Sequence, residues 1–207
     1  MEPNGSVGGQ RPRETASGDD ERRSDGALVR EIVVLVGSVL AIMGLLAAVS
    51  GVWPPLVAIE SGSMEPNIDT GDMVFVMGEE RFAGPNARDG VVTARRGGAY
   101  ERFDRAGDVI VFAPDGNPDR TPIIHRAMFY VEAGENWYGR ADPDAVGSAD
   151  NCRELANCPA PHAGFVTKGD AVRTYDQVEP TTSTVVRPEW VVGTAELRIP
   201  ELGWLRV

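Results

Sequence analysis

The chain has 207 residues, which suits one globular domain with a modest core once an anchor and a tail are set aside. Its 31 acidic residues outnumber the 20 basic ones, and this acidity argues against nucleic acid as a partner. The 15 Pro and 24 Gly residues, scattered among short β-branched runs, favour a loop-rich β protein over a helical one.

Only one of the basic residues is a lysine, Lys168. An acidic protein that happens to contain little lysine is one interpretation. The other, which we favour, is adaptation to high salt, because charges are screened beyond about 3 Å at 1 M salt and crowded carboxylates then repel each other little. The composition therefore predicts a halophilic protein.

The N-terminal part of the sequence predicts a tail followed by a membrane anchor. Residues 1–27 have almost no large apolar side chains, so we expect them to be disordered. Within the next segment, 28–53, the 22 residues from Ile32 to Trp53 carry no charge and reach about 33 Å as a helix, enough to span a bilayer. A cleaved secretory signal ending near Ala48-Val49-Ser50 is the alternative, but the apolar run is long for a signal and favours a retained anchor.

Basic residues on the two sides of this segment predict its orientation. Five arginines precede Ile32, whereas the first basic residue after it is Arg81. Because basic residues stay on the cytoplasmic side, we expect a cytoplasmic N-terminus, a single-pass anchor in the cell membrane and an extracytoplasmic domain. The five arginines are Arg11, Arg13, Arg22, Arg23 and Arg30.

Residues 54–207 predict a mainly β domain, with small antiparallel sheets around one core. Gly71-Asp72 and Gly107-Asp108 each precede a predicted strand, and residues 81–106 and 140–163 are interpreted as surface insertions. The strands are expected at Met73–Met77, 108–112, 122–132 and 189–199, with shorter candidates at 137–138 and 165–166.

Two cysteines, Cys152 and Cys158, lie in a polar loop. Without further Cys or paired His they do not predict a zinc site. A disulfide is expected if the domain is extracytoplasmic, and two free thiols are the alternative.

Few residues can act as the base for a serine nucleophile. Ser61-Gly62-Ser63 follows the apolar segment by about ten residues, and a serine hydroxyl needs a neighbouring base. His125 lies in an apolar strand, where a histidine is more often structural, and His162 lies in a polar loop. Lys168 is the other candidate, but its position before Gly169 predicts an exposed turn, where it stays charged. Spacing alone does not decide between them.

Five short motifs occur in the order found in a known family. Together they resemble the type I signal peptidases, and the histidine in place of a lysine is similar to the archaeal and endoplasmic-reticulum branch. The motifs are Ser61-Gly-Ser63-Met64-Glu-Pro66, Gly71-Asp-Met-Val-Phe-Val, Gly107-Asp-Val-Ile-Val-Phe, Ile124-His125-Arg126, and Lys168-Gly-Asp170 with Asp176.

The resemblance implies a catalytic role for each of these residues. Ser63 is the expected nucleophile, His125 its general base and Asp176 the required acid, with Asp170 in support. The Ser63 N–H, with the Ser61 hydroxyl, is expected to stabilise the oxyanion. The family usually continues Gly-Asp with two asparagines, whereas Ala and Val follow here, which puts the hydrogen bonding around Asp170 in doubt.

The function indicated is a membrane-anchored serine endopeptidase that removes signal peptides from exported preproteins. It needs no cofactor or metal, and its expected partners are secretory preproteins, membrane lipid and the export machinery. A tethered nucleophile stays near the membrane plane, where cleavage sites emerge. A non-enzymatic β domain that binds or scaffolds partners at the cell surface is the alternative.

Overall fold

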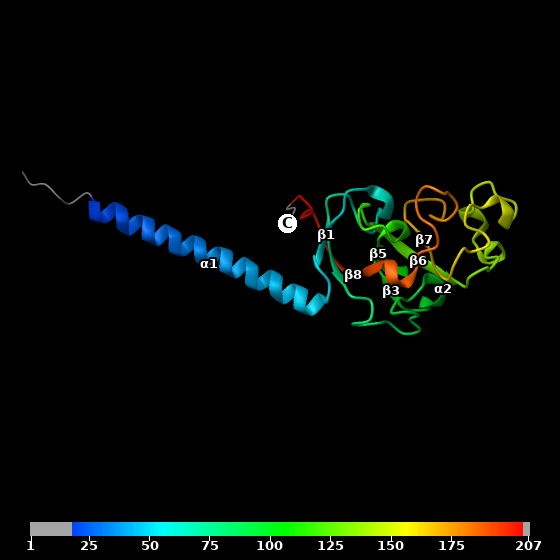
Figure 1. Ribbon diagram of the computed structural model, residues 1–207, viewed down its shortest axis with the longest axis horizontal. Helices are drawn as coiled ribbons and strands as arrows, with labels where there is room; N and C mark the ends of the chain where they lie inside the picture. The colour runs from blue at the N-terminus through cyan, green and yellow to red at the C-terminus, as the bar shows by residue number, and fades with distance from the viewer. Residues whose placement is uncertain (1–17, 205–207) are drawn as a thin grey trace, which may run out of the picture. The chain divides into compact units, whose positions relative to one another are not determined.

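The structure is a computed structural model that describes residues 18–204, with side chains from residue 26 onward. The fold is mainly β with antiparallel sheets, preceded by one apolar helix, as the sequence predicts (Figure 1). The chain forms two compact units, one ending at Gly44 and the other beginning at Leu45. The elements are α1 (Gly18–Ser50), β1 (Leu56–Ala58), β2 (Met73–Met77), α2 (Ala94–Gly97), β3 (Glu101–Arg102), β4 (Arg105–Ala106), β5 (Val109–Phe112), β6 (Ile123–Val131), β7 (Gly164–Lys168) and β8 (Val191–Ile199).

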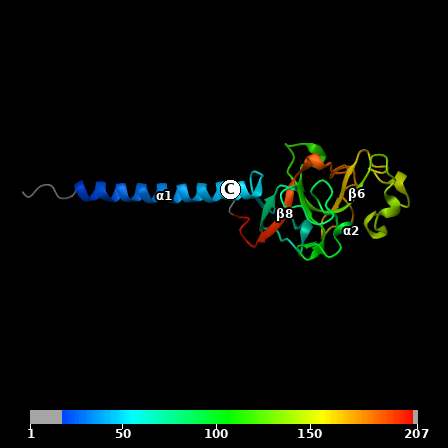
Figure 2. The ribbon, with the colours of Figure 1, turned by 90° about the horizontal axis from the view of Figure 1, so that it is seen from below.

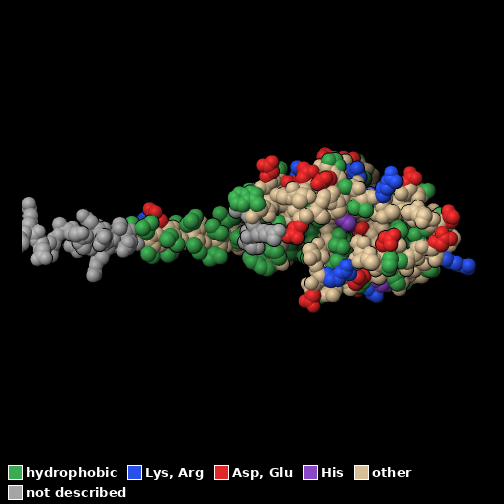
Figure 3. Space-filling view, turned by 90° about the horizontal axis from the view of Figure 1, so that it is seen from above, with side chains coloured by type: hydrophobic (Ala, Val, Ile, Leu, Met, Phe, Trp, Pro, Cys, Tyr) green, Lys and Arg blue, Asp and Glu red, His purple; other side chains and the backbone are tan. Residues whose placement is uncertain are grey.

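Helix α1 begins earlier than the predicted anchor and ends earlier too. The stretch Gly26–Ser50 is long and apolar enough to cross a membrane, and apolar side chains cover its surface (Figure 3). Of the tail predicted to be disordered, residues 1–17 lie outside the described residues, whereas residues 18–27 belong to the helix. Its last turn belongs to the second unit, the β unit, and is bonded to β2 and the residue after it. Ser50 Oγ donates to the Val76 carbonyl at 2.7 Å, and Gly78 N–H donates to the Ser50 carbonyl at 2.9 Å.

The main sheet has six strands in the order β1-β2-β8-β5-β6-β7, all antiparallel, and β3 and β4 form a separate hairpin. The last strand, β8, therefore lies between β2 and β5. Strand β6, nine residues long, pairs with both β5 and β7, so it carries its residues into the middle of the domain. Figures 1 and 2 show the segment around residues 140–160 beyond β6 and β7, at the opposite end of the β unit from β1.

Strand β5 explains why the core has two layers. All four of its residues are buried, and alternate side chains of a strand point to opposite faces. Val109 and Val111 accordingly pack with Val74 on one face, while Ile110 and Phe112 pack on the other. A third cluster lies between β6, β7 and residues 137–160, so the sheet is covered on both sides.

The two predicted Gly-Asp turns use their aspartates to hold distant segments. Asp72 and Asp108 are both buried. Asp72 accepts the N–H groups of Asp69 at 2.8 Å and Glu201 at 3.1 Å. Asp108 accepts the Val92 N–H at 2.7 Å and the Tyr100 hydroxyl at 2.8 Å, and burial raises the pKa of its carboxyl group. These acids are structural acceptors.

The two predicted surface insertions both contribute to the core. Val91 and Val92 are fully buried, which the polar and Gly-rich sequence around them conceals. Residues 140–163 likewise bury Leu155 and both cysteines. Acidic side chains are spread over the visible surface (Figure 3), and the prediction of a halophilic protein stays a prediction.

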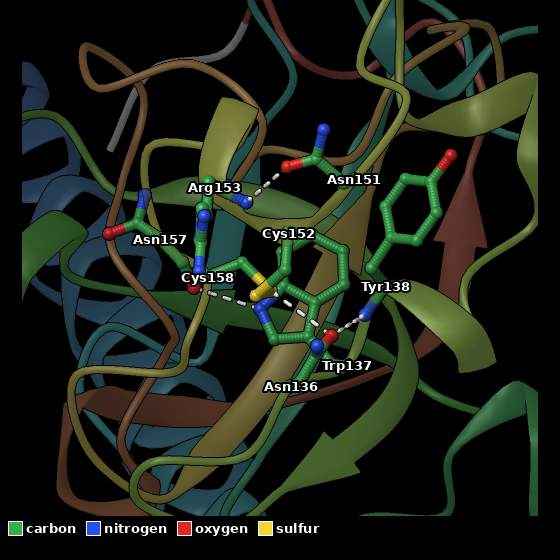
Figure 4. Close-up of a disulfide and its surroundings, with 8 residues drawn as sticks. All are labelled: Asn136, Trp137, Tyr138, Asn151, Cys152, Arg153, Asn157 and Cys158. Carbon is green, nitrogen blue, oxygen red and sulfur yellow. Dashed lines mark hydrogen bonds between the residues drawn. A yellow bond between two sulfur atoms is a disulfide. The ribbon is translucent and has the colours of Figure 1, made fainter.

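The short strand predicted at 137–138 is wrong. Asn136 Oδ1 accepts the Tyr138 N–H at 3.2 Å, a local bond that closes a turn, and a 3₁₀ helix follows at Tyr138–Arg140. The Trp137 indole is buried and donates to the Asn157 carbonyl at 2.8 Å. Figure 4 shows this ring beside the disulfide that joins Cys152 and Cys158, the first of the two alternatives drawn from the sequence.

Replacing both cysteines with serine should lower the free energy of unfolding by about 2 kcal/mol, because the closed loop is short and constrains the unfolded chain little. Thermal unfolding of the full chain in detergent measures the difference, with the oxidised wild-type protein as reference. Adding a reductant to the wild type should reproduce the loss. An unchanged midpoint in both experiments would show that the bond does not stabilise the domain.

Candidate active site

Ser63 lies in the short 3₁₀ helix η1 (Gly62–Met64). The side chain of Met64 is fully buried, which fixes this turn on the core, while Ser63 itself remains half-buried. The Ser63 carbonyl accepts the Ala171 N–H at 2.9 Å. The turn is therefore held from two directions, by the core and by the segment that follows β7.

Gly169 is the place where Ser63 and His125 meet. A Cβ atom built on Gly169 would lie 2.5 Å from the Ser63 carbonyl oxygen and 3.0 Å from His125 Nε2. A side chain does not fit at such distances, so glycine allows η1 and β6 to approach the same residue. The structure thus places the Ser63 carbonyl and His125 Nε2 against the same residue.

The other ring nitrogen of His125 contacts Asp176. Nδ1 lies 2.7 Å from Asp176 Oδ2, and the imidazole is only 10% exposed. The same carboxylate oxygen accepts the Thr167 hydroxyl at 2.7 Å, and Asp176 N–H donates to the Thr167 carbonyl at 3.0 Å. Because an ionised carboxylate only accepts, a neutral His125 carries its proton on Nδ1 and keeps a lone pair on Nε2.

Asp170 contacts a different partner, the next residue of β6. Its carboxylate accepts two bonds from Arg126, at 2.8 Å from Nε and 2.7 Å from Nη2, and both side chains are 2% exposed. It also accepts the Asn67 amide at 2.8 Å. Burial alone raises the pKa of the Asp170 carboxyl group, but the bonds from Arg126 and Asn67 outweigh it and hold that pKa below its ordinary value. The pair therefore stabilises the fold fully at pH values above the ordinary pKa of an aspartate. This stabilisation is lost as the pH falls through the lowered pKa of Asp170.

The absence of the usual two asparagines after Asp170 does not remove the contact to Ser63. Ala171 is exposed and reaches the Ser63 carbonyl through its backbone N–H. Any residue except proline supplies this donor. The hydrogen bonding around Asp170 that the sequence put in doubt is thus made by the side chains of Arg126 and Asn67, beside the main-chain bond of Ala171.

Lys168 differs from its sequence prediction. It ends β7 and is half-buried rather than exposed in a turn. Its Nζ donates to the carbonyls of Gly169 at 2.9 Å and Val172 at 2.7 Å, and burial lowers the pKa of its amine. Both contacts use the amine as a donor, so they hold the loop rather than present a lone pair to a hydroxyl.

The remaining candidates lie at the edge of the site or away from it. The Ser61 hydroxyl is exposed and 3.3 Å from the Ser63 hydroxyl, where either can donate. The ring of His162 packs against Trp190 at a centroid distance of 5.2 Å and its Nδ1 lies 3.1 Å from the Ala163 carbonyl. Among residues 26–204, no three His, Cys, Asp or Glu side chains are placed to hold a metal ion.

Sequence reasoning missed three residues that support the site: Arg126, Asn67 and Thr167. Arg126 had a signal, because a charged residue inside an apolar strand requires a buried partner. Besides Asp170, its Nη1 donates to the carbonyls of Arg102 at 3.0 Å and Gly107 at 2.8 Å. Asn67 and Thr167 had no signal, since both are ordinary turn or strand residues in the sequence.

Comparison with known proteins supports the resemblance to the signal peptidases. No family model matches the chain. The chain is 26% identical over 167 residues to the signal peptidase complex catalytic subunit SEC11 of Eremothecium gossypii, covering 78% of this chain and 70% of that protein. The resemblance to type I signal peptidases is confirmed. The relative agrees with the endoplasmic-reticulum and archaeal branch, which the histidine at position 125 indicated in the sequence analysis.

Gly169→Ala should lower the activity expected of a type I signal peptidase by about 100-fold, because the new methyl group pushes η1 away from His125. Cleavage of a secretory precursor by the full chain in detergent is the measurement. Gly139→Ala is the matched control, since a Cβ there meets nothing within 4 Å. Equal activity of the two variants would show that Ser63 and His125 do not need this close approach.

Proposed function

We propose that this protein is a membrane-anchored serine endopeptidase that cleaves signal peptides from exported preproteins. The observation that carries the proposal is the bond from His125 Nδ1 to Asp176, with Nε2 turned toward the residue that also contacts Ser63. A base oriented in this way can accept a serine proton. The likeness to a signal peptidase catalytic subunit supplies the class of substrate.

In this mechanism His125 Nε2 takes the proton of Ser63 as the hydroxyl attacks the scissile carbonyl. Asp176 holds the ring in the required tautomer and stabilises the imidazolium that forms. The imidazolium then protonates the leaving amine, and water, activated by the same base, releases the acyl group. The Ser63 N–H, at the start of a helical turn, has no partner within that turn and is the expected oxyanion donor, with the Ser61 hydroxyl beside it.

Asp170 acts as a positioning residue. It touches neither His125 nor the Ser63 hydroxyl in the contacts described, but it joins Arg126 of β6 to Asn67, four residues after Ser63. Its loss leaves the Arg126 charge buried without its partner, so we assign it a role in folding and alignment.

The apolar helix acts as a retained, single-pass anchor with the N-terminus in the cytoplasm. Its last turn supports this, because Ser50 bonds to Val76 and Gly78, and Arg81 Nη1 donates to the Ala48 carbonyl at 2.8 Å. Removing the segment at Ala48–Ser50 would break contacts of the folded domain. The relative is named as a subunit of a complex, and association with the export machinery extends that to this chain.

A non-enzymatic binding domain is the alternative. It explains the β fold but gives no reason for a buried carboxylate on Nδ1 of a histidine whose Nε2 faces a serine-bearing turn. We therefore favour the enzyme.

Ser63→Ala and His125→Ala should each lower the rate of precursor cleavage by about 10⁴-fold, because nucleophile and base act as a unit. Asp176→Asn should be severe, since the amide can hold the wrong tautomer, and Asp170→Asn should cost less. The measurement is the size shift of a secretory precursor incubated with the full chain in detergent.

Lys168→Met is the control for this series and should keep substantial activity, since the amine only holds the loop. Circular dichroism of each variant checks that it folds. An inactive Lys168→Met beside an active, folded His125→Ala would replace the proposed base with the lysine.

Activity should rise with pH and reach half its maximum within a unit or two of 6.5, because a protonated imidazole cannot accept the serine proton. Initial rates of precursor cleavage between pH 4 and pH 10 give the curve. A serine–lysine mechanism needs a neutral amine and so more alkaline conditions. Activity that begins only far above neutrality would count against His125.

Protease added to intact cells or right-side-out vesicles should digest the β domain and spare the N-terminal tail. An epitope at each end, followed by immunoblotting, distinguishes the two parts. Vesicles opened with detergent are the control, in which both parts are digested. A protected β domain would reverse the proposed orientation.

A further inference from the structure

The residue directly after Asp176 is a fully buried amide, Gln177. Its Oε1 accepts the Thr167 N–H at 2.9 Å. Its Nε2 donates to the Thr184 carbonyl at 3.1 Å and to the Thr167 hydroxyl at 3.2 Å. Both ends of the amide are therefore used, and its partners belong to two residues, Thr167 and Thr184.

These partners fix the orientation of the amide. A backbone N–H can only donate and a backbone carbonyl can only accept. Oε1 must therefore face the Thr167 N–H and Nε2 must face the Thr184 carbonyl. The Gln177 N–H that reaches the Thr167 hydroxyl is consequently a donor.

The fixed amide determines where the proton of Thr167 points. A hydroxyl group has one proton to donate. Because the Thr167 oxygen accepts from Gln177, its proton is directed at Asp176 Oδ2, 2.7 Å away. Asp176 Oδ2 thus receives two donors, the Thr167 hydroxyl and His125 Nδ1.

We propose that Gln177 is a positioning residue that acts through the Thr167 hydroxyl to keep Asp176 aimed at His125 Nδ1. This inference rests on the proposed function and deepens it, since it assigns a polar layer, formed by Thr167 and Gln177, behind the His125–Asp176 pair. The layer is buried, so a missing bond in it is not replaced by bulk water.

The disulfide-bridged segment supports this layer from behind. Asn157 Nδ2 donates to the Gln177 carbonyl at 3.1 Å, and the Asn157 carbonyl accepts the Trp137 indole N–H at 2.8 Å. Asn157 is directly followed by Cys158, whose bond to Cys152 fixes the loop (Figure 4). The segment that the sequence alone left without a role thus holds the backbone of Gln177.

Among the charged groups around this site, Lys168 of β7 interacts electrostatically with Asp176, and Lys168 also interacts with Asp170, Arg105 and Arg126. Their contacts do not include Gln177, and the variants below leave all of them in place. A change in the pH profile of those variants therefore reports the Gln177–Thr167 layer.

The test compares kcat/KM for precursor cleavage as a function of pH in the full chain in detergent. Gln177→Met keeps the length of the side chain without its hydrogen bonds, and Thr167→Val keeps the shape without the hydroxyl. Thr167→Ser restores the hydroxyl. Ser183→Ala is the control, because Ser183 is equally buried and, among the described residues, its hydroxyl accepts the Asp115 N–H rather than a group of this layer.

Gln177→Met and Thr167→Val should each lower kcat/KM at least about tenfold, and the double variant should be little worse than the poorer single one. With one donor fewer, the charge of Asp176 acts more strongly on the imidazolium. The midpoint of the pH curve should therefore move up, by about one unit in Thr167→Val and by less in Gln177→Met. Thr167→Ser and Ser183→Ala should keep the wild-type midpoint.

A readout without activity separates this inference from the proposed function. In a His162→Gln background His125 is the only histidine, and the NMR resonance of its Nδ1 proton should shift in Gln177→Met. If Ser63→Ala still cleaves precursor, the proposed function fails while this shift can still be measured. If Gln177→Met does not fold, Thr167→Val decides. A folded variant that loses activity without a change of midpoint or resonance would make the layer merely structural and overturn the proposal.

Discussion

One buried cation is the constraint on which the site depends. Arg126 lies in the sheet with its guanidinium almost fully buried, and such a charge costs several kcal/mol unless it is paired and hydrogen-bonded. Its partners are Asp170 and the carbonyls of the β3–β4 hairpin. Asp170 in turn binds Asn67, close to the turn of Ser63. Satisfying this charge therefore brings three distant parts of the chain to β6, where His125 is the neighbouring residue.

Much of the fold follows from local sequence patterns. The runs at Met73–Met77 and 122–132 became β2 and β6 because β-branched and aromatic residues alternate or cluster there and glycine, aspartate or proline precedes them. The meeting of Ser63, His125 and Asp176 was different: it was expected from a family resemblance, and spacing alone did not favour Asp176 over Asp170. The structure distinguishes the two acids because adjacent residues of β6 point to opposite faces, so each acid meets a different partner.

The features that the sequence did not predict depend on contacts between segments far apart in the chain. The burial of Val91 and Leu155 is invisible in polar, glycine-rich surroundings, because only the sheet beneath them makes them core residues. Lys168 looked like a turn residue, but β6 pairs with its backbone and two carbonyls surround its amine. The bonds of Gln177 join three segments, and no local pattern marks an amide whose partners are remote.

The position of β8 also has a consequence for the order of events during synthesis. The strand lies in the middle of the sheet, yet among the described residues it is the last strand to be made. Until Val191–Ile199 has left the ribosome, β1 and β2 have no neighbour that joins them to β5, β6 and β7. Before that point, the turn that carries Ser63 is held to the strand that carries His125 by loop and side-chain contacts, such as Asn67 to Asp170, without the sheet between β2 and β5. The sheet that joins the two halves of the site is therefore continuous only after β8 has emerged.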